Sequence, residues 1–135
     1  MSIAILTNLT SNDLIQRRLL NLAALFMGIN ALALSLAPGV RLPAVALADW
    51  AAAVWPYGLG WFCWALSFAL LNRLTARYLP HRDPFLLPAA ALLSGWGLLT
   101  IFRLSPSLGL RQAAWLVIAT LIVAFGLRLP ADLGF

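Results

Sequence analysis

The hydrophobic positions of this sequence gather into long runs, which are separated by short segments rich in arginine and proline. The runs cover residues 19–37, 50–72, 85–102 and 112–127. A helix that crosses a bilayer needs about 20 apolar residues. The last run is shorter, but arginines at its two ends can extend to the headgroups. The pattern therefore predicts an all-α integral membrane protein with four transmembrane helices, in a single domain over residues 1–135.

The segments between the runs carry signals that start and end helices. A capping-box spacing predicts that the first helix begins near Ser11, and Pro38-Gly39 predicts its end. Asp83 followed by Pro84 predicts the N-cap and first residue of the third helix. The segment 103–111 is expected to be a loop between the third and fourth helices.

Composition excludes other classes of protein. The chain has 135 residues, of which 63% are hydrophobic and 10% charged, and its mean hydropathy is +0.93. Soluble domains are about a quarter charged. We therefore exclude a soluble globular domain and a disordered chain. The length allows four spans, or at most five, and leaves no room for a soluble catalytic domain.

The charged residues are all arginine or aspartate, and the formal net charge is +5. Such a balance would suggest nucleic-acid binding in a soluble protein. Here the arginines bracket the apolar runs, so we interpret them as topology signals and headgroup contacts and expect no nucleic-acid partner. The arginines that carry this interpretation are Arg17, Arg18, Arg73, Arg77, Arg82, Arg111 and Arg128. Six of the nine arginines fall on the side of both termini, which predicts cytoplasmic termini in a multi-pass protein of a bacterial inner membrane.

Candidate chemistry is sparse. Cys63 is the single cysteine, which excludes an internal disulfide, and His81 is the single histidine and has no second metal ligand beside it. Asp49 is the one acid expected on the outer side, where it is interpreted as the N-cap of the second helix. No ionisable side chain falls within the middle of a run, although ion and proton pathways normally contain one. We expect no catalytic residue, no metal and no cofactor, and the sequence leaves open whether lipids, quinones or pigments bind the surface.

Small and aromatic residues predict close helix packing or a partner interface. Ala91 and Gly95 form a small-x-x-x-small pair that Gly97 extends, and such faces let helices approach closely in lipid. Trp61 and Trp64 are three residues apart and share a helix face. Asn30 is the most interior amide and is expected to form a hydrogen bond to a neighbouring helix.

From residue 82 to about residue 129 the chain carries a further series of motifs. They are Asp83-Pro84-Phe85-Leu86-Leu87-Pro88, Ser94-Gly95-Trp96-Gly97-Leu98-Leu99, Arg103-Leu104-Ser105-Pro106 and Arg111-Gln112-x-x-Trp115. In order and spacing they resemble the N-terminal helices of the SEDS family, the RodA and FtsW type of cell-wall glycan polymerases. The resemblance implies an inner position for the aspartate end and an outer position for the short loop. It does not reach the family's catalytic aspartate, which lies in a large outer loop further along, so it implies no catalytic residue here.

Two functions are therefore expected from the sequence. The first is a non-catalytic accessory or scaffold subunit of a larger membrane assembly, whose partners are other membrane subunits and the lipid bilayer. The sequence does not distinguish respiratory, photosynthetic and cell-wall assemblies. The alternative is the N-terminal portion of a split or degenerate SEDS-type peptidoglycan glycosyltransferase that acts in cell shape or division.

Overall fold

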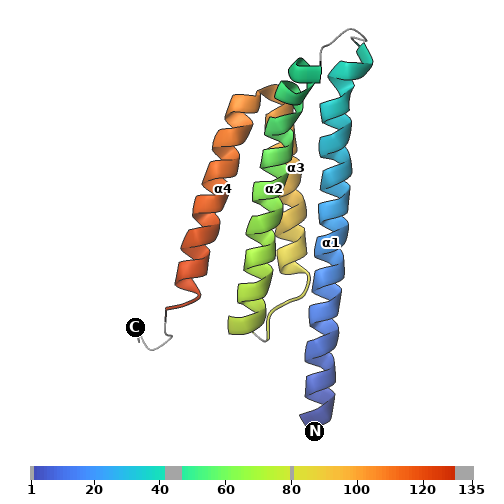
Figure 1. The fold of residues 1–135 in the computed structure, drawn as a ribbon. Helices are drawn as coiled ribbons and strands as arrows, with labels where there is room; N and C mark the ends of the chain where they lie inside the picture. The colour runs from blue at the N-terminus through green and yellow to red at the C-terminus, as the bar shows by residue number, and fades with distance from the viewer. Residues whose placement is uncertain (1, 42–46, 80, 130–135) are drawn as a thin grey trace.

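The chain folds into long helices that run up and down in turn (Figure 1). The computed structural model describes the backbone of residues 2–41, 47–79 and 81–129, and the side chains of 11–36, 51–52, 54–79 and 81–129. The helices are α1 (Ser2–Arg41), α2 (Leu47–Tyr78), α3 (Leu86–Leu104) and α4 (Pro106–Gly126). Each contains a stretch long and apolar enough to cross a membrane. The prediction of an all-α protein with four potential membrane-spanning helices is confirmed.

The central pair of helices is α2 and α3. Both α1 and α4 contact this pair, and among the described residues α1 does not contact α4. Figure 1 shows α1 and α4 on opposite sides of the pair. The connection from α2 to α3 lies at the same end as the start of α1, and we call this the Arg82 end. The opposite end, where α3 turns into α4, we call the Ser105 end.

The first two helices are longer than predicted. The first helix begins at Ser2 and not near Ser11, because residues 2–10 contain no glycine or proline that would stop it. It also continues through Pro38 to Arg41, since a proline so near a helix end removes only one hydrogen bond. The second helix begins at Leu47, so Asp49 falls inside its first turn and the predicted N-cap role is wrong.

The ends of α3 also differ from the prediction. The helix begins at Leu86, and Asp83 instead closes the turn before it, because the Asp83 carboxylate accepts a hydrogen bond from the Phe85 backbone N–H (2.9 Å). The predicted 103–111 loop is reduced to Ser105, whose backbone is extended (φ −157°, ψ 119°). Pro106 can follow at once as the first residue of α4, because a proline there lacks an N–H that would have no partner.

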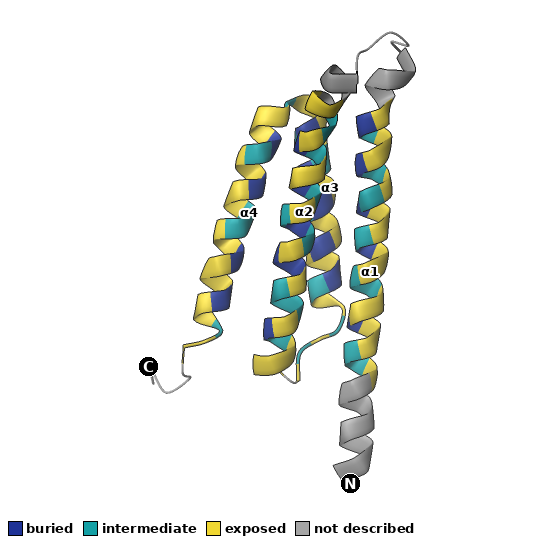
Figure 2. Ribbon diagram, in the orientation of Figure 1, coloured by how far each residue is buried: buried dark blue, intermediate teal, exposed yellow. Residues whose placement is uncertain are grey.

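The buried residues form one stripe along each helix, facing its neighbours (Figure 2). Their centre consists of Met27 from α1, Trp64 and Phe68 from α2, and Phe102 from α3. The outward faces are also apolar, as the large exposed side chains of Leu93 and others show. In water this surface would be costly, whereas in a bilayer it is the ordinary lipid-facing surface of a helix bundle.

Candidate functional site

A polar network closes the bundle at the Arg82 end. The Arg82 side chain is only 12% exposed, and its Nη2 lies 2.6 Å from Oδ1 of Asp13 on α1. The Arg82 Nε donates to Oε1 of Gln16 (2.8 Å). Gln16 is 1% exposed, and its own Nε2 donates to Oδ1 of Asn72 on α2 (2.7 Å). The network therefore joins α1, α2 and the segment before α3.

The Arg82 guanidinium also holds the C-terminal turns of α2. Its Nη1 donates to the carbonyl oxygens of Thr75 (3.1 Å) and Leu79 (3.3 Å). A helix C-terminus carries carbonyl groups without intrahelical partners and partial negative charge, and both favour a cation. The interpretation of Arg82 as a headgroup contact is therefore wrong, because the guanidinium turns inward to acceptors on two helices. Arg17, Arg18, Arg73, Arg77, Arg111 and Arg128 are all exposed.

The sequence reading missed Asp13 and Gln16 as members of this network. The available signal was their spacing, because residues three apart lie on one face of a helix and place a carboxylate beside an amide. Their partner is 69 and 66 residues away in the chain, respectively. No local pattern indicates contacts at such separations.

Four of the predicted packing residues lie between helices. Ala91 is 0% exposed, and Gly95 packs against the Met27 and Trp64 side chains. The Trp64 indole N–H donates to the Ala91 carbonyl oxygen (3.1 Å), and the Trp61 indole N–H donates to the Ala24 carbonyl oxygen (3.2 Å). Although they are three residues apart on α2, the two tryptophans thus bond to different neighbours, α3 and α1.

The other two predicted residues do not contact a neighbouring helix in the expected way. Gly97 is exposed, and a Cβ added to it would meet nothing within 4 Å. The Asn30 side chain donates to the Phe26 carbonyl oxygen of its own helix (2.8 Å), so the expected bond between helices is not formed. An asparagine side chain can reach the carbonyl oxygen four residues earlier in its own helix, and here that local bond satisfies the amide N–H.

Metal-ligating and nucleophilic side chains are scattered over the described part of the chain. Cys63 is half-buried against the core, and His81 is exposed. Among the described residues, no three histidine, cysteine or acidic side chains gather where they could hold a metal ion.

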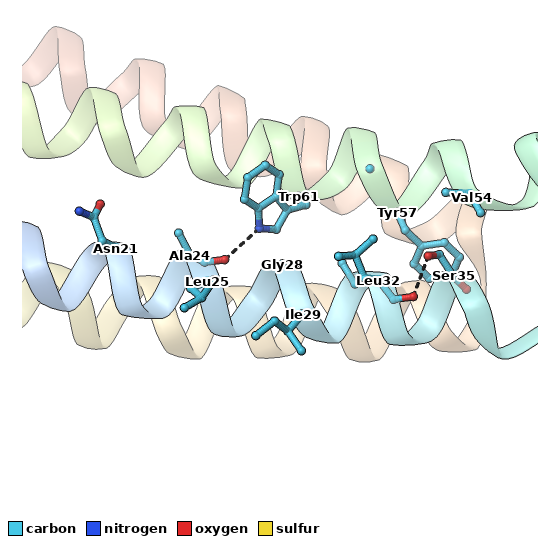
Figure 3. Close-up of a pocket in the computed structure, with 12 residues that line it drawn as sticks. Asn21, Ala24, Leu25, Gly28, Ile29, Leu32, Ser35, Val54, Tyr57 and Trp61 are labelled. Carbon is cyan, nitrogen blue, oxygen red and sulfur yellow. Dashed lines mark hydrogen bonds between the residues drawn. The ribbon is translucent and has the colours of Figure 1, made fainter.

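A long groove follows the contact between α1 and α2 (Figure 3). Its larger part, about 610 Å³, is apolar and runs along Ala24 and Gly28 on α1 beside Tyr57 and Trp61 on α2. Its other part, about 470 Å³, lies at the Arg82 end and is lined by the arginines Arg17, Arg18 and Arg73 together with apolar side chains. Asn21 and Ala24 line both parts, and the Trp61 indole, which is bonded to the Ala24 carbonyl oxygen, lies where the two parts meet.

No family model, curated protein or solved structure matches the chain.

Proposed function

We propose that this chain is a non-catalytic accessory or scaffold subunit of a larger membrane assembly, and that a partner helix packs on the outer face of α3. The observation that supports the proposal is the exposure of Gly97 in open space on that face. Ala90 and Thr100 are exposed on the same face, seven residues before and three residues after Gly97. Leu93, which is 75% exposed, lies between Ala90 and Gly97 on this face, so small and large side chains alternate along it.

The physical reason lies in how helices associate in lipid. Lipid chains are as apolar as leucine, so association depends on close packing, which small residues allow. A glycine inside a helix costs roughly 1 kcal/mol relative to alanine. If only lipid contacts this face, nothing compensates for the lower helix stability that Gly97 causes. The packing energy of a second helix that approaches the backbone at Gly97 would compensate for it.

The rest of the molecule suits a scaffold. The Arg82 network ties α1 and α2 at one end, and the two indole bonds tie α2 to α1 and to α3 near mid-height. Such side-chain bonds between helices hold the bundle as one body that can present α3 in a constant orientation. The proposal includes the expected topology, with both termini on the cytoplasmic side of a bacterial inner membrane.

The test is purification of the tagged full chain in mild detergent, followed by identification of every chain that copurifies. Gly97→Leu is expected to lower recovery of the partner about tenfold, because a large side chain blocks close approach. Gly126→Leu is the matched control, since Gly126 on α4 also has nothing within 4 Å of its added Cβ. If both variants retain the partner equally, the outer face of α3 contacts lipid and the proposal fails.

The same experiment addresses the SEDS-type alternative. A copurifying chain with the missing helices and a large outer loop would favour a split polymerase. For the scaffold, the purified chain alone is expected to make no polymer from a lipid-linked disaccharide, and Asp49→Asn is expected to leave its complex unchanged. Polymer formation by the lone chain that Asp49→Asn abolishes would contradict the non-catalytic role.

A further inference from the structure

Three arginines line the α1–α2 groove at the Arg82 end. Arg17 and Arg18 project from α1 and Arg73 from α2, and all three are exposed. Within the described part of the chain, no hydrogen bond or ion pair engages any of them. Asp13, one turn before Arg17, already bonds to Arg82 (2.6 Å). The mouth of the groove therefore carries positive charge that the described residues do not neutralise.

Apart from the arginines and the amides of Asn21 and Asn72, this part of the groove is lined by apolar side chains. Trp64 and Phe68 form its floor, and the small side chains of Ala65 and Ala69 leave space along α2. On the other side of the Trp61 indole, which is bonded to the Ala24 carbonyl oxygen, the larger apolar part follows toward the Ser105 end (Figure 3). A ligand that fills the part at the Arg82 end must combine an anionic group with an apolar chain.

We propose that this groove binds an anionic phospholipid of the leaflet at the Arg82 end, with its phosphate at the three arginines and an acyl chain along the groove. Guanidinium groups bind phosphate oxygens through paired hydrogen bonds, and clustered arginines near a membrane surface attract anionic lipids. The hydrocarbon core of a bilayer is about 30 Å thick, so an acyl chain of one leaflet spans about 15 Å, or about ten helical residues. The distance from Arg18 to Gly28 provides that length, and the lining on α1 extends beyond it to Ser35.

Asn21 adds a further contact at a suitable depth. Its exposed amide lies on the groove wall one turn beyond Arg17 and Arg18, where the ester groups of a lipid follow the phosphate. The amide can donate to an ester carbonyl oxygen. A free anion would use the arginines but not the apolar groove, and a zwitterionic lipid brings its own cation to the site. Among the described residues, those that line the groove all belong to α1 and α2, so this inference is independent of a partner on α3.

The test is native mass spectrometry of the full chain with equimolar phosphatidylglycerol and phosphatidylcholine of identical acyl chains. The parent protein is expected to retain phosphatidylglycerol at least about tenfold better. The triple variant Arg17→Gln/Arg18→Gln/Arg73→Gln is expected to lose this preference. The control Arg103→Gln/Arg111→Gln/Arg128→Gln removes the same charge from exposed arginines outside the groove and should keep it.

Two further measurements separate a lipid from other occupants. Inorganic phosphate at the concentration of the lipid should not displace phosphatidylglycerol, and Ala69→Phe should weaken its retention by filling the groove while every arginine remains. Equal retention of the two lipids by the parent would overturn the proposal, as would equal loss of the preference in both triple variants. Displacement by inorganic phosphate alone, or a protein segment crosslinked in the groove in place of lipid, would also overturn it.

Discussion

The Phe102 ring packs against Gly60 of α2 and Gly109 of α4. We therefore predict that a larger residue at Gly60 lowers the free energy of unfolding. Phe102 is 1% exposed, and a Cβ added to either glycine would overlap its ring. A phenyl ring is rigid and cannot bend away as the end of a methionine can. Gly60→Ala should therefore force the helices apart or push Phe102 from its rotamer. Overpacking of this kind typically costs about 1–3 kcal/mol.

The matched control lies two residues away on the same helix. Gly58 is exposed, and an added Cβ there meets nothing within 4 Å. Alanine gains roughly 0.5–1 kcal/mol over glycine in a helix, and both variants share this gain. The difference in the free energy of unfolding between Gly60→Ala and Gly58→Ala therefore isolates the clash. We expect Gly60→Ala to be less stable than Gly58→Ala by about 1–3 kcal/mol.

The free energy of unfolding is measured by titrating sodium dodecyl sulfate into mixed micelles and following circular dichroism. A double-mutant cycle identifies the ring as the cause, since Gly60→Ala should cost much less in a Phe102→Leu background. Equal stability of the two alanine variants would refute the packing of α2 on α3. If Gly60→Ala lowers the free energy of unfolding by the same amount in the Phe102→Leu background, the Phe102 ring is not what the added methyl group clashes with.

Three further predictions concern the polar contacts and the topology. Arg82→Gln should destabilise the bundle by about 1.5–3 kcal/mol, because buried Gln16 loses a charged partner. The exposed control Arg77→Gln should change the free energy of unfolding by less than about 0.5 kcal/mol in the same titration. Similar losses in both variants would contradict a stabilising role of the Arg82 network. Trp64→Phe removes the indole bond to α3 and should cost at least about 0.5–1.5 kcal/mol, and a variant as stable as the parent would disprove that bond's contribution. In a cysteine-free background, an impermeant thiol reagent added outside cells should label Ser107→Cys and not Phe135→Cys; the reverse pattern would invert the orientation.

The sequence alone determines that this chain is a bundle of helices suited to a membrane. Apolar length and scarce charge are properties of a segment, so they can be read without knowing its neighbours. The exposed arginines border the apolar runs in the sequence, so their positions at the ends of the helices could be predicted from the sequence in the same way. Helix ends were harder to predict, as α1 and the Ser105 connection show, because a cap or a proline permits a boundary without requiring one.

The tertiary structure decides which residues meet. Gly95 and Gly97 belong to the same small-residue pattern, yet a separation of two residues puts them on opposite sides of α3, one against Trp64 and one in open space. Arg82 resembles the other arginines in sequence, and only the fold brings Asp13 and Gln16 to it. The part of the groove with the three arginines likewise exists only once α1 and α2 lie side by side, because the residues of α1 and α2 that line it are 40 or more residues apart in the chain. Such contacts depend on how helices dock, and the pattern within one helix carries no information about that.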